Sequence, residues 1–372
     1  MSDLMFSSGL ILLGMVGLVI GGEWLVRGAS NLAVAARISP LVIGITLVSF
    51  GTSAPELAVT VQAAYAGSSQ LAVGNLVGSN IANVLLILGA AALVAPLSVH
   101  SRIVKVDVPM SCAAAVGLWL LAQDGGLSRL DGLLLFAILV VYLVWSVRQG
   151  RGEDNRIRQQ LVDALMADDR GPSAAAVAEV GQGAGTLIRQ GLLVIGGLIL
   201  LVAAARLMVT GASEIARGLG VSELVIGLTV VALGTSLPEL VASALASLRG
   251  QGDIAVGNVV GSNLFNILAV LGIGAMVAPG GIPVSTEVLQ QDLPIMIAAT
   301  FVCLPIFFTD ARVSRIEGLL LLGYYIAYIA YLTMGATDAA HTRSFEVVML
   351  GFVIPLTMLA IGAGVYQSVR AR

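Results

Sequence analysis

Two glutamates stand out in a chain of 372 residues, of which 58% are apolar and only 11% are charged. Glu56 and Glu239 each lie inside an apolar stretch that contains no Lys or Arg. A charged side chain at the centre of a membrane helix costs at least about 2.5 kcal/mol on insertion scales, and such residues commonly mark ion or proton pathways. We therefore interpret both acids as functional groups. The alternative is a neutral or hydrogen-bonded acid with a structural role only.

Each glutamate is the last residue of a short motif that should interrupt a helix. The motifs are GTSAPE at residues 51–56 and GTSLPE at residues 234–239. Proline has no N–H and clashes with the carbonyl four residues earlier, so nearby carbonyl oxygens should be released from the helix. These carbonyls are the ones near Ser49 and Thr52 and, in the second motif, near Ala232 and Thr235. In a bilayer, released carbonyls persist only where they line a cavity or bind something. The alternative is a simple proline kink, but a kink would not require Thr, Ser and Glu within one turn.

A second pair of motifs supplies further polar groups: GNLVGSNIAN at residues 74–83 and GNVVGSNLFN at residues 257–266. Ser79 and Asn83 are four residues apart and therefore share one helix face, as do the equivalent Ser262 and Asn266. We interpret these four residues as ligands. For four other asparagines, close helix packing and a ligand role remain equal alternatives. These are Asn75, Asn80, Asn258 and Asn263.

The combined donor set consists of carboxylate, amide, hydroxyl and carbonyl oxygens. Both histidines, His100 and His341, fall in expected loops, and both cysteines, Cys112 and Cys303, are expected to be inert packing residues. Oxygen ligands suit Ca²⁺ and other hard cations, whereas zinc and copper favour nitrogen or sulfur. Two carboxylates also balance the charge of one Ca²⁺ or two Na⁺, so competition for one pair of acids offers a route to exchange. The sequence has no Gly-rich phosphate loop, which argues against ATP as the energy source.

The two sets of motifs belong to an internal repeat. Residues 41–89 match residues 224–272 at 26 of 49 positions when aligned without a gap. Around the repeat lie eleven apolar runs of a length suited to membrane helices, which excludes a water-soluble globular protein. The runs cover about 4–22, 41–65, 71–97, 103–122, 130–147, 187–209, 224–248, 254–278, 292–308, 316–334 and 346–367. Each repeat therefore has five spans, and because five is odd the second repeat must enter the membrane from the opposite side.

We thus expect an all-α polytopic membrane protein with two inverted five-helix repeats, ten core helices and an eleventh C-terminal helix. The predicted parts are a first repeat at 1–148, a connector at 149–186, a second repeat at 187–335 and the extra helix with its tail at 336–372. The first run is expected to be a retained span, since no basic residue precedes it and no small-residue cleavage site follows it.

The basic residues predict the orientation in the membrane. With the N-terminus outside and the connector and C-terminus in the cytoplasm, 15 of the 19 Lys and Arg residues lie on the cytoplasmic side, as the positive-inside rule requires. The four exceptions are Arg129, Arg206, Arg217 and Arg343. The expected location is a bacterial inner membrane. Basic residues spread so thinly form no surface for nucleic acid.

The paired motifs resemble those of the cation/Ca²⁺ exchanger superfamily, and within it the prokaryotic Na⁺/Ca²⁺ exchanger-like antiporters. The resemblance implies ten core helices, alternating access and four cation sites at mid-membrane. It implies that Glu56 and Glu239 are shared Ca²⁺ and Na⁺ ligands, with backbone oxygens from Thr52 and Thr235. The remaining implied ligands are Ser53, Ser79 and the Ser49 carbonyl at one Na⁺ site, Ser236, Ser262 and the Ala232 carbonyl at its mirror image, and Asn83 and Asn266 in the middle.

One position departs from part of that superfamily. Some members, including K⁺-dependent animal exchangers, have Asp where this chain has Asn266, which argues against K⁺ dependence. Repeats of the Gly-Asn-x-x-Glu type, typical of proton-coupled Ca²⁺ exchangers, are absent from the sequence.

The function indicated by these residues is Na⁺-driven antiport that exports Ca²⁺, without enzymatic activity or a cofactor. The expected partners are the two transported ions and the lipid bilayer, with no indication of a protein partner. An antiporter coupled to H⁺, or one for another divalent cation, is the main alternative. A cation channel is disfavoured by two inverted halves in one chain, and an intramembrane hydrolase is disfavoured because Ser53 and Ser236 have no nearby His or Lys base.

Overall fold

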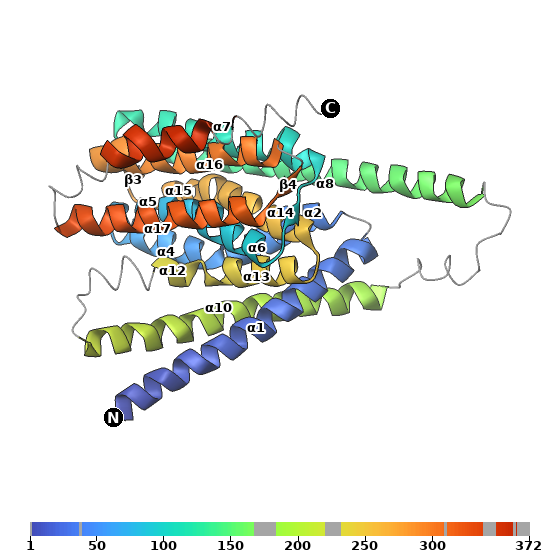
Figure 1. Ribbon diagram of the computed structural model, residues 1–372, viewed down its shortest axis with the longest axis horizontal. Coiled ribbons are helices and arrows are strands. Elements are labelled where there is room, and N and C mark those ends of the chain that lie inside the picture. Colours follow the sequence, from blue (N-terminus) through green and yellow to red (C-terminus); the bar gives the residue numbers. More distant parts are fainter. Residues whose placement is uncertain are drawn as a thin grey trace.

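The computed structural model describes residues 2–36, 39–166, 184–219, 232–308, 311–337, 347–359 and 362. Within these ranges, eight helices are long and apolar enough to cross a membrane. A ninth span consists of two helical segments, Pro40–Thr52 and Ala54–Tyr65, that meet at an angle of 44°. The chain is therefore an integral membrane protein built almost entirely of helices (Figure 1).

The first repeat contains one long helix, one broken span, one span with a π-helical centre and two further spans. In chain order its elements are α1 (Ser2–Ala36), α2 (Pro40–Ile43), η1 (Gly44–Val48), α3 (Ser49–Thr52), α4 (Ala54–Tyr65), α5 (Ser69–Ala82), η2 (Asn83–Leu88), α6 (Gly89–Val94), η3 (Ile103–Asp107), α7 (Val108–Leu121), η4 (Ala122–Asp124) and α8 (Arg129–Met166).

The described elements of the second repeat follow the same order of spans. They are α10 (Ala184–Gly218), α12 (Ala232–Thr235), α13 (Leu237–Leu248), α14 (Gly252–Phe265), η6 (Asn266–Leu271), α15 (Gly272–Val277), η7 (Val288–Asp292), α16 (Leu293–Phe308) and α17 (Arg315–Thr337). The start of its broken span, residues 224–231, lies outside the described residues. The π-helical segments η2 and η6 begin at Asn83 and Asn266, each three residues after the end of a GNxxGSN motif. The two repeats therefore share the helix type at this position.

Two short antiparallel ladders reveal the inverted arrangement. β1 (Leu97–Ser98) pairs with β4 (Arg312–Val313), and β2 (Gly126–Leu127) pairs with β3 (Ile282–Pro283). β1 and β3 each follow the third span of their own repeat. Each pairs with a strand that follows the fourth span of the other repeat. Figure 1 shows β3 and β4 at opposite ends of the helical bundle. Equivalent loops of the two repeats therefore lie at opposite ends, which confirms the predicted inversion.

α1 and α10, the first helix of each repeat, lie against each other along one side of the bundle (Figure 1). Small residues allow this close approach: a Cβ on Gly197 would lie 2.6 Å from the Leu25 backbone nitrogen and 2.7 Å from the Gly21 carbonyl oxygen. Close contact between small residues is the usual way in which membrane helices associate. Away from this contact, the Ser7 hydroxyl of α1 donates to the Glu214 carboxylate of α10 at 2.7 Å.

The centre of the bundle is formed by the third span of each repeat, α5–η2–α6 and α14–η6–α15. Side chains on both spans, such as Leu76, Ile87, Leu264 and Leu271, are fully buried. α14 packs against η1 and α3 of the first repeat as well as α13 of its own repeat. The GNxxGSN motif of the second repeat consequently lies beside the GTSxPE motif of the first.

The fifth span is longer than its apolar run indicates. α8 continues as a helix to Met166 and projects beyond the bundle in Figure 1. The first part of the predicted connector, 149–166, is therefore helical, whereas residues 167–183 lie outside the described residues. The described part of the predicted eleventh span, residues 347–359, is also helical. It contacts α17, where the Tyr324 hydroxyl donates to the Thr357 hydroxyl at 2.7 Å.

A buried polar cluster joins the start of the fourth span to α8. The Arg102 guanidinium lies 3.6 Å from the Asp107 carboxylate and also donates to the Ser146 hydroxyl. The Tyr142 hydroxyl donates to Asp107 at 2.8 Å, and the Trp145 ring lies 5.4 Å from the guanidinium carbon. Because all of these groups have partners inside the protein, the cluster serves as a structural connection between spans.

Candidate cation site

The two glutamates occupy equivalent positions at the breaks in the second and seventh spans. Glu56 lies in the first turn of α4 and Glu239 in the first turn of α13, and each turn contains the proline of its motif. The helix breaks immediately before, at Ser53 (φ −79°, ψ 5°) and Ser236 (φ −90°, ψ 3°). Both carboxylates therefore lie near a helix N-terminus, whose partial positive charge stabilises an anion.

Neither carboxylate has a hydrogen-bond partner among the described residues, although both are buried. Glu56 and Glu239 are each 1% exposed, and all four of their carboxylate oxygens lack a hydrogen bond. Buried polar groups are nearly always paired, and a buried charge is costly unless it is compensated. A pair of unpartnered acids in the same interior is therefore the arrangement expected of a cation site.

The structure brings the motifs of both repeats together around these acids. Ser79 of the first repeat and Thr235 of the second lie beside Glu56. Thr52 and Ser53 of the first repeat lie beside Glu239, which also interacts electrostatically with Glu56. Each carboxylate is thus approached by hydroxyl groups from the opposite repeat, and the two halves form one site.

The central asparagines are held by a matching pair of hydrogen bonds across the repeats. The Asn83 amide nitrogen donates to the Asn263 side-chain oxygen at 3.0 Å, and the Asn266 amide nitrogen donates to the Asn80 side-chain oxygen at 3.1 Å. The side-chain oxygens of Asn83 and Asn266 are buried and have no partner. Because an amide that uses its nitrogen in one direction presents its oxygen in another, Asn80 and Asn263 orient the two central oxygens.

Four serines complete the set of candidate side-chain ligands. The hydroxyls of Ser53, Ser236 and Ser262 are buried and have no hydrogen-bond partner among the described residues. Ser79 is 4% exposed and lies beside Glu56. With the two acids and the two central asparagines, they make eight side chains that the sequence singled out as ligands and that the structure buries.

The expected backbone ligands are more heavily engaged. The Ser49 carbonyl accepts the Ser53 amide at 2.9 Å, so it is not released from the helix as the proline position indicated. A carbonyl oxygen has two lone pairs, and the Thr52 hydroxyl also lies 3.4 Å from the Ser49 carbonyl oxygen. The Thr52 hydroxyl donates to the Val48 carbonyl at 3.1 Å and lies 3.2 Å from the Asn258 side-chain oxygen. Ala232 is the first residue of α12, the helical turn before the second break.

Two further asparagines take part in helix packing, the role that the sequence left open. The Asn258 amide nitrogen donates to the Ser243 hydroxyl at 3.0 Å, and Asn75 donates to the Thr60 hydroxyl at 3.5 Å. Sequence reasoning missed Thr60 and Ser243. The signal was present, since the two hydroxyl residues occupy equivalent positions in the aligned repeats.

The chemistry of the site follows from these donors. Within the part of the chain that the structure describes, no group of three His, Cys, Asp or Glu residues could hold a metal ion. The site instead combines two carboxylates with neutral amide, hydroxyl and carbonyl oxygens. Such a set suits Ca²⁺, which takes six to eight oxygen ligands. A site with few charged ligands binds Ca²⁺ less tightly, which favours release of the ion after transport.

Comparison with known proteins identifies a matching family and several relatives of the chain. The sodium/calcium exchanger protein family model matches residues 6–148 and 190–334, the two halves described above. The chain is 39% identical to the putative antiporter CaxA of Alkalimonas amylolytica, covering 86% of this chain and 96% of that protein. It is 37% identical to the inner membrane protein YrbG of Escherichia coli (88% and 97% covered). Identity is 32% to the sodium/calcium exchanger MaX1 of Methanosarcina acetivorans (87% and 97%).

The fold agrees with a solved structure of the same kind. The sodium-calcium exchanger NCX_Mj superposes with a TM-score of 0.74 at 29% sequence identity, over 88% of this chain and 99% of that one. The family match, the full-length relatives and the shared inverted repeats lead to one assignment. The protein is a member of the sodium/calcium exchanger family, a family of cation/Ca²⁺ antiporters.

Proposed function

We propose that the protein exchanges Na⁺ for Ca²⁺ and exports Ca²⁺ from the cytoplasm, driven by the Na⁺ gradient. The observation that carries this proposal is the pair of buried, unpartnered carboxylates Glu56 and Glu239, one from each inverted repeat, within an all-oxygen environment. One Ca²⁺ or two Na⁺ would neutralise the two acids, so the ions compete for the same groups. Competition for one site is the physical basis of exchange.

The proposed ligands follow the symmetry of the site. Glu56 and Glu239 are shared between Ca²⁺ and Na⁺, with the Thr52 and Thr235 backbone oxygens beside them. Asn83 and Asn266 contribute their side-chain oxygens in the middle. The flanking Na⁺ sites are formed by Ser53, Ser79 and the Ser49 carbonyl on one side, and by Ser236, Ser262 and the Ala232 carbonyl on the other.

Alternating access is supported by the position of α1 and α10 over both broken spans. A Cβ on Gly51, next to the first break, would overlap the Leu198 side chain of α10. A Cβ on Gly234, next to the second break, would overlap the Val209 side chain of the same helix. If α1 and α10 moved together, helix packing would tighten over one break and loosen over the other. Rocking of repeats has this effect in transporters built from inverted repeats.

The proposed orientation is that of the positive-inside rule, with the N-terminus outside and the connector and C-terminus in the cytoplasm. α1 begins at the end of the bundle where β3 lies in Figure 1, which makes the β2–β3 end external and the β1–β4 end cytoplasmic. The proposed location is a bacterial inner membrane, which is where the name of the Escherichia coli relative, inner membrane protein YrbG, places that protein.

Uptake into proteoliposomes under single-ion gradients tests the coupling ion. Vesicles loaded with Na⁺ and diluted into Na⁺-free medium containing radioactive Ca²⁺ should accumulate Ca²⁺. Vesicles with only an outward H⁺ or K⁺ gradient should not exceed the protein-free background. Uptake driven by the H⁺ gradient alone would identify the protein as a proton-coupled antiporter, and uptake without any gradient would indicate a channel.

A further inference from the structure

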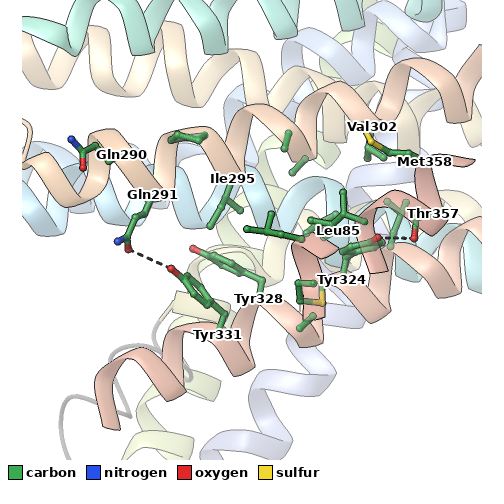
Figure 2. Close-up of a pocket in the computed structure, with 18 residues that line it drawn as sticks. Leu85, Gln290, Gln291, Ile295, Val302, Tyr324, Tyr328, Tyr331, Thr357 and Met358 are labelled. Atoms are coloured by element: carbon green, nitrogen blue, oxygen red, sulfur yellow. Dashed lines mark hydrogen bonds between the residues drawn. The ribbon is translucent and has the colours of Figure 1, made fainter. Parts of the chain in front are cut away.

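An apolar cavity of about 480 Å³ lies between α16, α17 and the described helical residues 347–359. This size is within the range of about 300 to 1,000 Å³ that is typical of small-molecule sites. Figure 2 shows the cavity as a slot along α16, with Gln290, Gln291 and Tyr331 at one end and Val302 and Met358 at the other. The third wall belongs to the extra helix, which lies beyond the region that the family model matches.

The slot has the dimensions of one bilayer leaflet. It extends along the end of η7 and along α16, from Gln291 to Val302, a length of about 16 Å at 1.5 Å per residue. Half of a hydrocarbon core of about 30 Å is about 15 Å. Because the surrounding helices are apolar and long enough to cross a membrane, the medium that enters the slot is the hydrocarbon of the bilayer.

The two side-chain amides of the slot lie at one end, where the Tyr331 hydroxyl lies 3.5 Å from the Gln291 side-chain oxygen. The middle is lined by apolar side chains such as Leu85 and Ile295, and at the other end the Tyr324 and Thr357 hydroxyls are paired with each other at 2.7 Å. No described residue that lines the slot is charged. The Asp292 carboxylate, which interacts with Tyr328, is an acid near this end.

We infer that the slot binds one acyl chain of a zwitterionic phospholipid, with the head group beside Gln290, Gln291 and Tyr331. Pockets that select anionic lipids do so with Lys or Arg side chains. The described lining has none, and Asp292 would repel a net negative head group. The inference rests on the cavity, and the ion site does not enter it.

Photolabelling with a lipid analogue tests this inference. The intact protein is reconstituted in vesicles of phosphatidylcholine doped with phosphatidylcholine that carries a diazirine on one acyl chain, irradiated, and mapped by mass spectrometry. Adducts are expected at Ile295 and Val302, which line the slot and are half-buried, well above those at Val141, which is 69% exposed on α8 and serves as the reference for bulk lipid contact. The same label on phosphatidylglycerol should give weaker adducts in the slot.

Filling the slot should remove the adducts. Ala298→Trp places an indole in the slot, and each excluded methylene costs about fourfold in binding, so the loss of two or more lowers slot labelling by about 15-fold. Ala327→Phe narrows the slot from α17 and provides a second variant. Val141→Trp is the matched control and should leave slot labelling unchanged, with an unaltered size-exclusion profile indicating a folded protein.

Three results would overturn the inference. Slot adducts no stronger than those at Val141, or undiminished in both filled variants, would show only bulk lipid contact. Preferential labelling by phosphatidylglycerol would contradict the zwitterionic assignment. Slot adducts that disappear as the protein-to-lipid ratio is raised would assign the slot to a second copy of the chain.

Discussion

Replacing Asn263 by alanine should weaken Ca²⁺ binding although Asn263 is not itself proposed as a ligand. In the structure its side-chain oxygen accepts the amide nitrogen of Asn83 at 3.0 Å, and the Asn83 oxygen has no partner. Asn263→Ala removes that acceptor, so the Asn83 amide can rotate and present its nitrogen to the cation. The equivalent substitution, Asn80→Ala, removes the acceptor of Asn266.

The size of the effect follows from the hydrogen bond that is lost. Asn83 and Asn263 are 1% and 2% exposed, so the bond is between two buried side chains on different helices. Such bonds in membrane proteins contribute about 0.6 kcal/mol on average and about 1.7 kcal/mol at most. If that energy is spent on orienting the Asn83 oxygen, the apparent Ca²⁺ affinity should fall by about threefold to about 20-fold. By symmetry, the loss of Ca²⁺ affinity caused by Asn80→Ala should lie in the same range.

The assay is the Ca²⁺ concentration dependence of Na⁺-driven uptake in proteoliposomes. The matched control is Ser247→Ala, which removes another buried hydrogen bond between helices, from the Ser247 hydroxyl to the Ala91 carbonyl at 2.7 Å. Ser247 lies about two turns beyond Glu239 on α13, and its loss should affect stability without changing Ca²⁺ affinity. Unchanged affinity in both asparagine variants, or an equal loss in Ser247→Ala, would refute the proposed orienting role.

Three other predictions concern stability. Gly197→Ala should lower the free energy of unfolding by about 1 to 3 kcal/mol, because its Cβ would collide with the α1 backbone. The adjacent Gly196→Ala, whose nearest neighbour would be 3.7 Å away, should leave thermal unfolding unchanged. Arg102→Met should cost about 3 to 5 kcal/mol by leaving Asp107 buried without its ion partner, and adding Asp107→Asn should restore most of the loss in the same measurement. Ca²⁺ at 100 times its dissociation constant should stabilise the wild type by about 2.7 kcal/mol, and chelation should reverse this. The stabilisation should be absent in Glu56→Gln.

The overall fold could be predicted because the sequence repeats itself in units with an odd number of spans. The alignment of residues 41–89 with 224–272 placed each proline, each glutamate and each asparagine at an equivalent position. An inverted arrangement then follows from topology alone, and the crossed pairing of the strand ladders confirms it.

The contacts between the repeats could not be predicted in the same way. Helix periodicity places Asn83 on a face of its own helix, but it does not identify the partner across the site, which proves to be Asn263. The hydrogen bond of the Ser49 carbonyl could not be predicted either. A proline indicates that a helix is interrupted, but it does not indicate which nearby carbonyl still accepts a hydrogen bond.

Charge alone does not show whether a residue at the end of a span is exposed. The distribution of basic residues predicts that Arg102 lies on the cytoplasmic side, but it does not indicate that its side chain is 6% exposed and paired with Asp107. Residues 149–166 are predicted to be part of a polar connector, but the sequence does not show where α8 ends. Arg, Glu and Gln are good helix formers, and α8 continues through these residues to Met166. Composition indicates that a segment is polar, but it does not determine where a helix ends.

The central claim is that Glu56 and Glu239 together bind the exchanged ions. Na⁺-driven Ca²⁺ uptake by Glu56→Gln and by Glu239→Gln tests this claim most directly, because each substitution removes one negative charge while keeping the size of the side chain. Both variants should fold, as judged by size-exclusion chromatography, and both should show uptake at the protein-free background. Wild-type rates in both variants would contradict the account.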